Sequence, residues 1–200
     1  MGRQAKDTPS TFQPAPIGTH VARAIKIIDI GTHHGSYQGV PNVRNQFILF
    51  WELPTETFAT EEGLKPFIVS KFYTNSLNEK ATLRADLVSW RGKEFAPEEL
   101  EGFDLMNILG KPCLVTVIEG VEKDKRKVSS VSGVPKGMEC PPQVNPSFAF
   151  FIEEWSDATF EGLSDGLKKL IRESDEYKAR MGEGAPSATQ APKKDDDLPF

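Results

Sequence analysis

Several features that would indicate catalysis or a membrane anchor are missing from this sequence. It has two cysteines, Cys113 and Cys140, and no CxxC pair, so we expect reduced thiols, with Cys113 in the core. No stretch approaches the roughly 18 apolar residues that a membrane helix requires. The phosphate-binding, dinucleotide-binding and metalloprotease motifs GxxxxGKS/T, GxGxxG and HExxH are absent. These absences predict a protein that is not an enzyme and does not cross a membrane.

Metal-binding and nuclease patterns are missing as well. His33 and His34 are adjacent, and no C-x₂₋₄-C or H-x₃₋₅-H spacing occurs. Asp29 and Asp86 are isolated carboxylates, whereas a nuclease needs a cluster of them. The sequence therefore predicts no metal site and no cofactor.

The charge of the chain is segregated along its length. The formal net charge is -5, which alone argues against nucleic-acid binding. Residues 20–51, 65–93 and 111–136 carry net charges of +2, +4 and +3, whereas residues 52–64, 94–110 and 137–165 carry -4, -5 and -6. A phosphate backbone responds to the local field, so the basic segments keep nucleic acid open as a ligand. Ordinary surface patchiness is the alternative explanation.

The pattern of apolar residues predicts three strands, a helical insert and a hairpin. The strands end at Gly31, at Pro54 and at Thr74, and a capping box from Ser76 to Glu79 begins the insert. An extra strand and an amphipathic helix follow the hairpin. The expected ranges are strands 20–31, 45–53 and 66–74, helix 77–90, a hairpin over 112–135, a strand within 147–155 and a helix over 160–171.

This order is that of an OB-fold, a five-stranded barrel with its helix between strands three and four. We therefore expect a mainly β chain with helical insertions and an extra C-terminal strand and helix. The expected organisation is a flexible arm over 1–18, a nucleic-acid-binding domain over 19–181, and a disordered linker with an acidic protein-interaction tail over 182–200.

An OB-fold binds its ligand across strands two and three, between two loops that here correspond to residues 32–44 and 120–127. Single strands need cations for phosphates and flat rings for bases. Side chains alternate across a strand, so we assign Trp51 to the core and Phe50 to the nucleic-acid side, and we place Lys71 and Tyr73 on one face. The predicted DNA-binding residues are Arg23, Lys26, Arg44, Phe50, Lys71, Tyr73, Arg91, Lys93, Lys123, Lys125, Arg126 and Lys127.

The chain ends in "KKDDDLPF", and this end resembles the acidic tail of bacterial single-stranded DNA-binding proteins. The stretches "SKFYTNSLNEKATLRADLVSWRGKEF" and "GFDLMNILGKPC" resemble a family of phage-encoded OB-fold proteins of DNA replication and recombination, over roughly residues 17–175. The resemblance implies a protein-interaction tip made of Asp195, Asp196, Asp197, Leu198, Pro199 and Phe200.

Together these observations predict sequence-independent single-stranded DNA binding in phage replication, recombination and repair. The expected location is the cytoplasm of an infected or host bacterial cell. The tail would recruit a helicase, primase, polymerase or nuclease, and self-association is a further expectation. Two alternatives remain: a single-strand annealing or recombination mediator, and an OB-fold protein-interaction adaptor that binds no nucleic acid.

Overall fold

The computed structural model describes residues 13–122 and 125–182 of the 200 residues. Most of the expected N-terminal arm and nearly all of the expected tail lie outside these ranges. The described chain is mainly β, as predicted. Its elements, in order, are β1 (Gly18–Tyr37), β2 (Val40–Thr60), β3 (Gly63–Thr74), α1 (Thr82–Arg91), α2 (Pro97–Glu101), η1 (Leu105–Ile108), β4 (Pro112–Glu119), β5 (Arg126–Ser132), β6 (Phe148–Phe150), η2 (Ile152–Glu154), α3 (Asp157–Glu161), α4 (Asp165–Arg172) and α5 (Asp175–Arg180).

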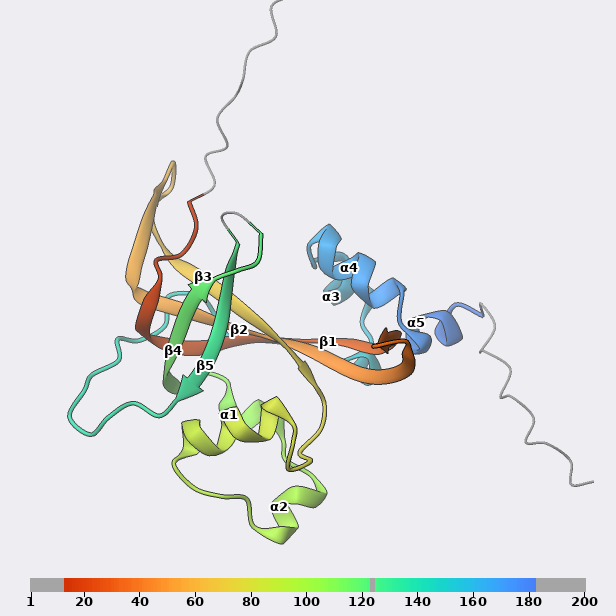
Figure 1. Ribbon diagram of the computed structural model, residues 1–200. Helices are drawn as coiled ribbons and strands as arrows, with labels where there is room; N and C mark the ends of the chain where they lie inside the picture. The colour runs from red at the N-terminus through yellow and green to blue at the C-terminus, as the bar shows by residue number, and fades with distance from the viewer. Residues whose placement is uncertain (1–12, 123–124, 183–200) are drawn as a thin grey trace, which may run out of the picture.

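The strands form one curved sheet in the order β3-β2-β1-β4-β5, with β6 added parallel to β1 (Figure 1). The other four pairings are antiparallel. The expected closed barrel is not formed, because no backbone ladder joins β3 to β5 among the described residues. Helix α1 packs against both strands at one end of this seam, and Gly133 N donates to Ser89 O where β5 meets α1.

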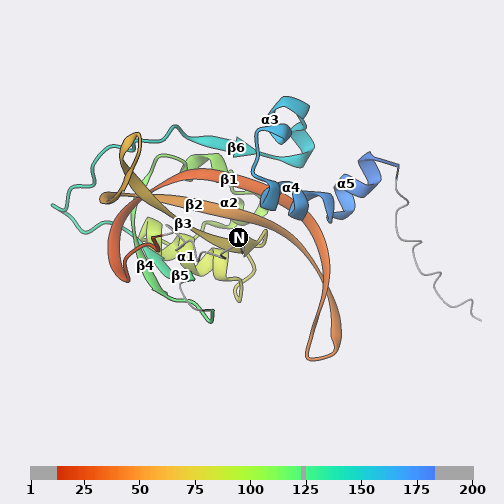
Figure 2. The same cartoon turned by 90° about the horizontal axis from the view of Figure 1, so that it is seen from above.

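The first two strands are much longer than the sequence predicts. Residues 32–44, expected as a loop, continue β1 and β2 as a two-stranded ribbon that turns at Gln38 and Gly39. The ribbon runs past the rest of the sheet, and α4 and α5 lie beside it (Figures 1 and 2). Gly31 has a φ of +76°, and a Cβ there would lie 2.6 Å from the Ser174 Cβ, so only glycine allows α5 to approach this closely.

The helices also differ from the sequence prediction. Helix α1 begins at Thr82 rather than residue 77, because Ser76 Oγ accepts from Asn78 N at 3.2 Å and Asn78 Oδ1 accepts from Lys80 N at 3.1 Å. These bonds favour a turn over the predicted capping box. The expected helix over 160–171 is divided into α3 and α4 near Gly162.

The sheet buries apolar side chains on both of its faces. The inner face packs against α1, and Trp51, which the sequence assigns to the core, lies in this cluster with Leu83 and Leu87. The outer face of β1 and β2 packs against β6, α3 and α4, and Ile48 and Ile171 lie in this second cluster. The outer face of β2 is therefore largely covered, although the sequence assigned it to the ligand.

Two charged side chains fix the long segment between β5 and β6. The Arg23 guanidinium donates to the carbonyls of Gly110, Cys140 and Pro141 at 2.6–2.8 Å. The fully buried Glu52 carboxylate accepts from Val144 N at 2.6 Å and from the backbone and side chain of Asn145 at 2.8 and 2.5 Å. The segment is thereby held against β1 and β2.

Within the described ranges, no helix has the length and apolar character needed to cross a membrane.

Candidate nucleic-acid interface

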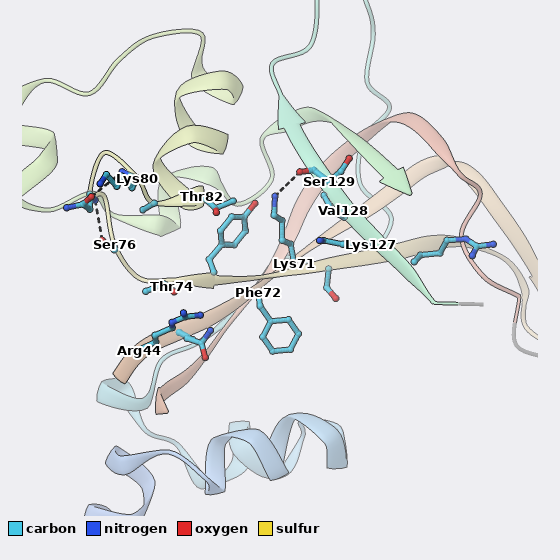
Figure 3. A pocket seen from close by; sticks show the side chains of 16 residues that line it. Arg44, Lys71, Phe72, Thr74, Ser76, Lys80, Thr82, Lys127, Val128 and Ser129 are labelled. Atoms are coloured by element: carbon cyan, nitrogen blue, oxygen red, sulfur yellow. Dashed lines mark hydrogen bonds between the residues drawn. The ribbon is translucent and has the colours of Figure 1, made fainter. Parts of the chain in front are cut away.

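A groove of about 1030 Å³ lies where the sheet fails to close, between β3 and β5 (Figure 3). Its walls come from the N-terminal part of β2, from β3, from the turn that precedes α1 and from the start of β5. The described residues that line it are Arg44, Gln46, Ser70, Lys71, Phe72, Tyr73, Thr74, Ser76, Asn78, Lys80, Ala81, Thr82, Arg126, Lys127, Val128 and Ser129.

The charge of this lining has one sign. Five of its residues are cationic, namely Arg44, Lys71, Lys80, Arg126 and Lys127, and none of the described lining residues is acidic. Serine, threonine and asparagine supply most of its other polar groups. The acidic segments that dominate the net charge lie elsewhere in the chain. The groove is therefore a place where an anionic polymer meets a positive local field.

Lys71 spans the seam between the two strands. Its Nζ donates to Asp86 Oδ2 on α1 at 2.7 Å and to the Ser129 carbonyl on β5 at 3.1 Å. Figure 3 shows Lys71 pointing toward β5, with the bond to Ser129 drawn as a dashed line. A side chain thus joins β3 to β5 at a place where the described backbone forms no ladder.

Tyr73 follows Lys71 on the same face of β3, as predicted, but it is only 2% exposed. Its ring stacks on Phe47 with centroids 5.6 Å apart, and its hydroxyl donates to Asp86 Oδ2 at 2.6 Å. Burial, together with the nearby Asp86 carboxylate, raises the pKa of Tyr73, so the phenol stays protonated and donates. The expectation of a partly exposed Tyr73 is not met, and its ring is not available to a base.

The exposed ring of β3 is that of Phe72, which has 52% of its surface accessible. It lies on the opposite face of the strand from Lys71 and points away from β5 in Figure 3. Because it also lines the groove, the groove reaches around the free edge of β3. Phe72 is the aromatic side chain best placed here to stack on a base.

The predicted basic loop is only partly represented in the groove. Arg126 and Lys127 line it from the start of β5, and the Arg126 Nε donates to the Ala15 carbonyl at 2.9 Å. Lys125 is exposed one residue before the strand. Lys123 lies outside the described residues.

Four predicted residues lie away from the groove. Lys26 and Phe50 are on the outer face of the sheet, where the Lys26 Nζ lies 5.6 Å from the centre of the half-buried Phe50 ring. Arg91 stacks on Phe95 at 4.4 Å and forms an ion pair with Glu99. Lys93 is exposed in the turn after α1 and does not line the groove. A fifth, Arg23, holds the backbone carbonyls described above.

A smaller hollow of about 240 Å³ adjoins the groove on the β1–β2 ribbon. It shares Arg44 and Gln46 with the groove and is otherwise lined by His33, His34, Gly35, Ser36 and Asn42. Arg44 therefore connects the two hollows, although the His34 ring is itself paired with Asp175 at 2.6 Å.

Lys80 and Phe72 line the groove but are not among the residues that the sequence predicts to bind DNA. Lys80 was placed inside a helix, whereas the structure holds it in the turn over the groove. The signal for Phe72 is its alternation with Lys71 and Tyr73, but the polarity of that pair predicts that their face is the exposed one. The structure reverses this choice.

One sequence motif of enzymes does occur in the chain. Residues 162–166, Gly-Leu-Ser-Asp-Gly, fit the spacing GxSxG of a hydrolase nucleophile elbow. That motif requires a strand before the serine and a helix after it, whereas here Ser164 lies between α3 and α4. The structural context of the elbow is missing.

Comparison with known proteins gives no matching family model and no matching curated protein.

Proposed function

We propose that this protein binds single-stranded DNA in the groove between β3 and β5, without sequence preference and without catalysis. The observation that carries the proposal is the lining of the groove, with five cations and no acidic side chain among its described residues. Phosphates would lie along Arg44, Lys80 and Lys127, and a base would stack on Phe72. Neither contact reads base identity, because cations meet the backbone and every base has a flat face.

A flexible single strand suits this groove better than a duplex does. Lys80 and Lys127 lie on the β5 side of β3, whereas Phe72 lies on the other face of the sheet, together with Arg44 (Figure 3). A ligand must bend around the edge of β3 to use both and must offer an unpaired base. Duplex DNA is stiff over about 150 base pairs and keeps its bases stacked.

We also propose that the fold is an OB-fold whose last pairing is made by side chains. The strand order β3-β2-β1-β4-β5 and the position of α1 between β3 and β4 support this assignment. Lys71, which reaches Ser129 O, takes the place of a β3–β5 ladder.

The proposed biological role is DNA replication, recombination and repair, with partner proteins recruited through residues 195–200. This part rests on the sequence "DDDLPF", because these residues lie outside the described ranges. Deleting residues 195–200 should abolish binding to a replication partner such as a helicase or polymerase. Phe200→Ala should reproduce most of that loss, because the terminal ring fills an apolar pocket on the partner.

The direct test is a salt titration of a labelled oligo-dT and of a duplex of equal length. We expect tighter binding of the single strand and a linear log–log dependence on salt. Lys80→Gln and Lys127→Gln should each reduce the slope by about 0.7, the value for one phosphate contact on a single strand. Lys136→Gln, an exposed lysine outside the groove, is the matched control and should change nothing.

Equal affinity for the two oligonucleotides would reject the proposal. So would a log–log salt slope that stays unchanged in both Lys80→Gln and Lys127→Gln. A chain that binds no oligonucleotide would favour the protein-interaction adaptor instead.

A further inference from the structure

A single buried carboxylate lies directly behind the groove. Asp86, on α1, is 9% exposed, and its Oδ2 accepts both the Lys71 Nζ at 2.7 Å and the Tyr73 hydroxyl at 2.6 Å. It is not among the groove-lining residues, so it acts on a ligand only through the side chains in front of it.

We infer that Asp86 masks Lys71 from the ligand, so that this cation braces the groove without contacting a phosphate. The inference rests on the proposed function. It means that an ion pair within the protein limits the affinity of the groove for single-stranded DNA. Lys71 is then a positioning residue, and the mask lowers the number of phosphates that the groove can neutralise.

The surroundings of the Lys71 ammonium support the mask. Two of its three donors are used by Asp86 and by the Ser129 carbonyl, and the ammonium lies 5.4 Å from the centre of the Tyr73 ring. Its side chain is only 12% exposed. A phosphate could engage Lys71 only by drawing it away from a carboxylate already within hydrogen-bond distance.

The other groove cations are placed differently. Within residues 13–122 and 125–182, no ion pair is found for Arg44, Lys80, Arg126 or Lys127. Arg44, Lys80 and Lys127 are also exposed. These side chains can meet a phosphate without first losing an acidic partner, so they account for the salt dependence and Lys71 does not.

The test is Asp86→Asn, which keeps the shape of the side chain and an acceptor for Tyr73 but removes the charge. Unmasking Lys71 should add one phosphate contact, so the log–log slope for oligo-dT should steepen by about 0.7. Affinity should rise, and the gain should be about 2.6-fold larger at 50 mM than at 200 mM salt. A residue with only a structural role would not steepen the slope when it is replaced.

The controls separate the mask from general charge and from folding. Glu98→Gln removes one exposed carboxylate of α2, away from the groove, and should leave the slope unchanged. Lys71→Met combined with Asp86→Asn replaces the ion pair by neutral groups and should keep the wild-type slope. If a thermal melt shows that Asp86→Asn alone is unfolded, the salt slope of this double variant still tests whether Lys71 contacts a phosphate.

Two results would overturn the inference that Asp86 masks Lys71. One is an Asp86→Asn slope equal to or shallower than that of the wild type. The other is a double variant whose slope is shallower by about 0.7, since Lys71 would then contact a phosphate in the wild type. A wild-type protein that binds no single strand would instead reject the proposed function, and the mask with it.

Discussion

Two of the strand edges that have no neighbouring strand in the described residues differ in how they are covered. On β1, beyond its pairing with β6, helix α5 covers the edge, and the Glu176 carboxylate accepts from Thr32 N at 2.7 Å and from the Thr32 hydroxyl at 2.6 Å. On β3, the free edge faces the groove, and the Lys71 ammonium reaches across it to donate to the Ser129 carbonyl.

The difference lies in what surrounds each edge. The β1 edge adjoins the outer apolar cluster, in which Phe160, Leu163 and Ile171 are buried. The β3 edge has cations and hydroxyl groups around it. A covering helix whose carboxylate accepts from the edge amide closes that edge to other partners, whereas a charged, open edge remains available to a ligand. The covering of β1 contributes to stability, and under the proposed function the open edge of β3 is the one that binds the ligand.

The largest expected effect concerns the covered edge. Ile171 is fully buried in the outer cluster, so Ile171→Ala should lower the free energy of unfolding by about 2–5 kcal/mol. Denaturant titration measures this loss. Leu64→Ala, at a position that is 72% exposed, is the control and should cost less than about 0.5 kcal/mol.

The same Ile171→Ala variant, if it stays folded, should keep the wild-type salt slope for oligo-dT, because the outer cluster lies away from the groove. A variant that remains folded but loses this slope would show that the two edges are not independent.

The next effect concerns the open edge. Phe72→Ala should weaken oligo-dT binding by about 1–3 kcal/mol, the usual worth of one base stacked on an aromatic ring. Stability should change little, because about half of the side chain is already exposed. Fluorescence anisotropy measures the affinity, and Phe72→Trp should preserve it.

Ile68→Ala is the matched control for Phe72, since Ile68 is 46% exposed on the same face of β3 but has no ring. If the two substitutions weaken oligo-dT binding equally, the ligand is held at this edge by general apolar contact rather than by stacking on a ring.

The difference between the two edges could be predicted from the sequence only in part. Alternation on β2 correctly placed Trp51 in the core, and the apolar pattern after Thr74 correctly predicted a helix between the third and fourth strands. These patterns depend only on residues within one strand or helix, so they can be read without knowing how the elements pack. The succession of three strands, a helical insert and two strands along the chain was likewise predicted.

The groove could not be predicted in the same way, because it depends on contacts between residues of different elements. Lys71 suggested an exposed face for β3, but Asp86, fifteen residues later, pairs with it and allows that face to be buried. Glu52 belongs to the acidic segment 52–64, yet it is fully buried against the backbone of Val144 and Asn145. A charged residue reveals nothing about burial until its partner is known.

The smallest expected effect is a pH dependence at the covered edge. Burial raises the pKa of Glu176, but the hydrogen bonds from the Thr32 hydroxyl and backbone outweigh it, so the net pKa is lowered. A carboxyl group with a lowered folded-state pKa stabilises the fold above its unfolded pKa, and this contribution is lost as the pH falls through the folded value. Glu176→Gln should therefore cost about 1 kcal/mol at pH 7, and the cost should shrink as the pH falls below about 4.5.

Asp29 partly opposes this effect, because its pKa is raised chiefly by burial and, to a smaller degree, by Glu176. Removing the Glu176 charge relieves that repulsion, so the measured cost should be smaller than the hydrogen bonds alone would give. Denaturant titrations of wild type and variant between pH 3 and 8 measure the difference. A cost that stays constant across this range would mean that the Glu176 charge does not hold α5 to β1, and the covered edge would then depend on apolar burial alone.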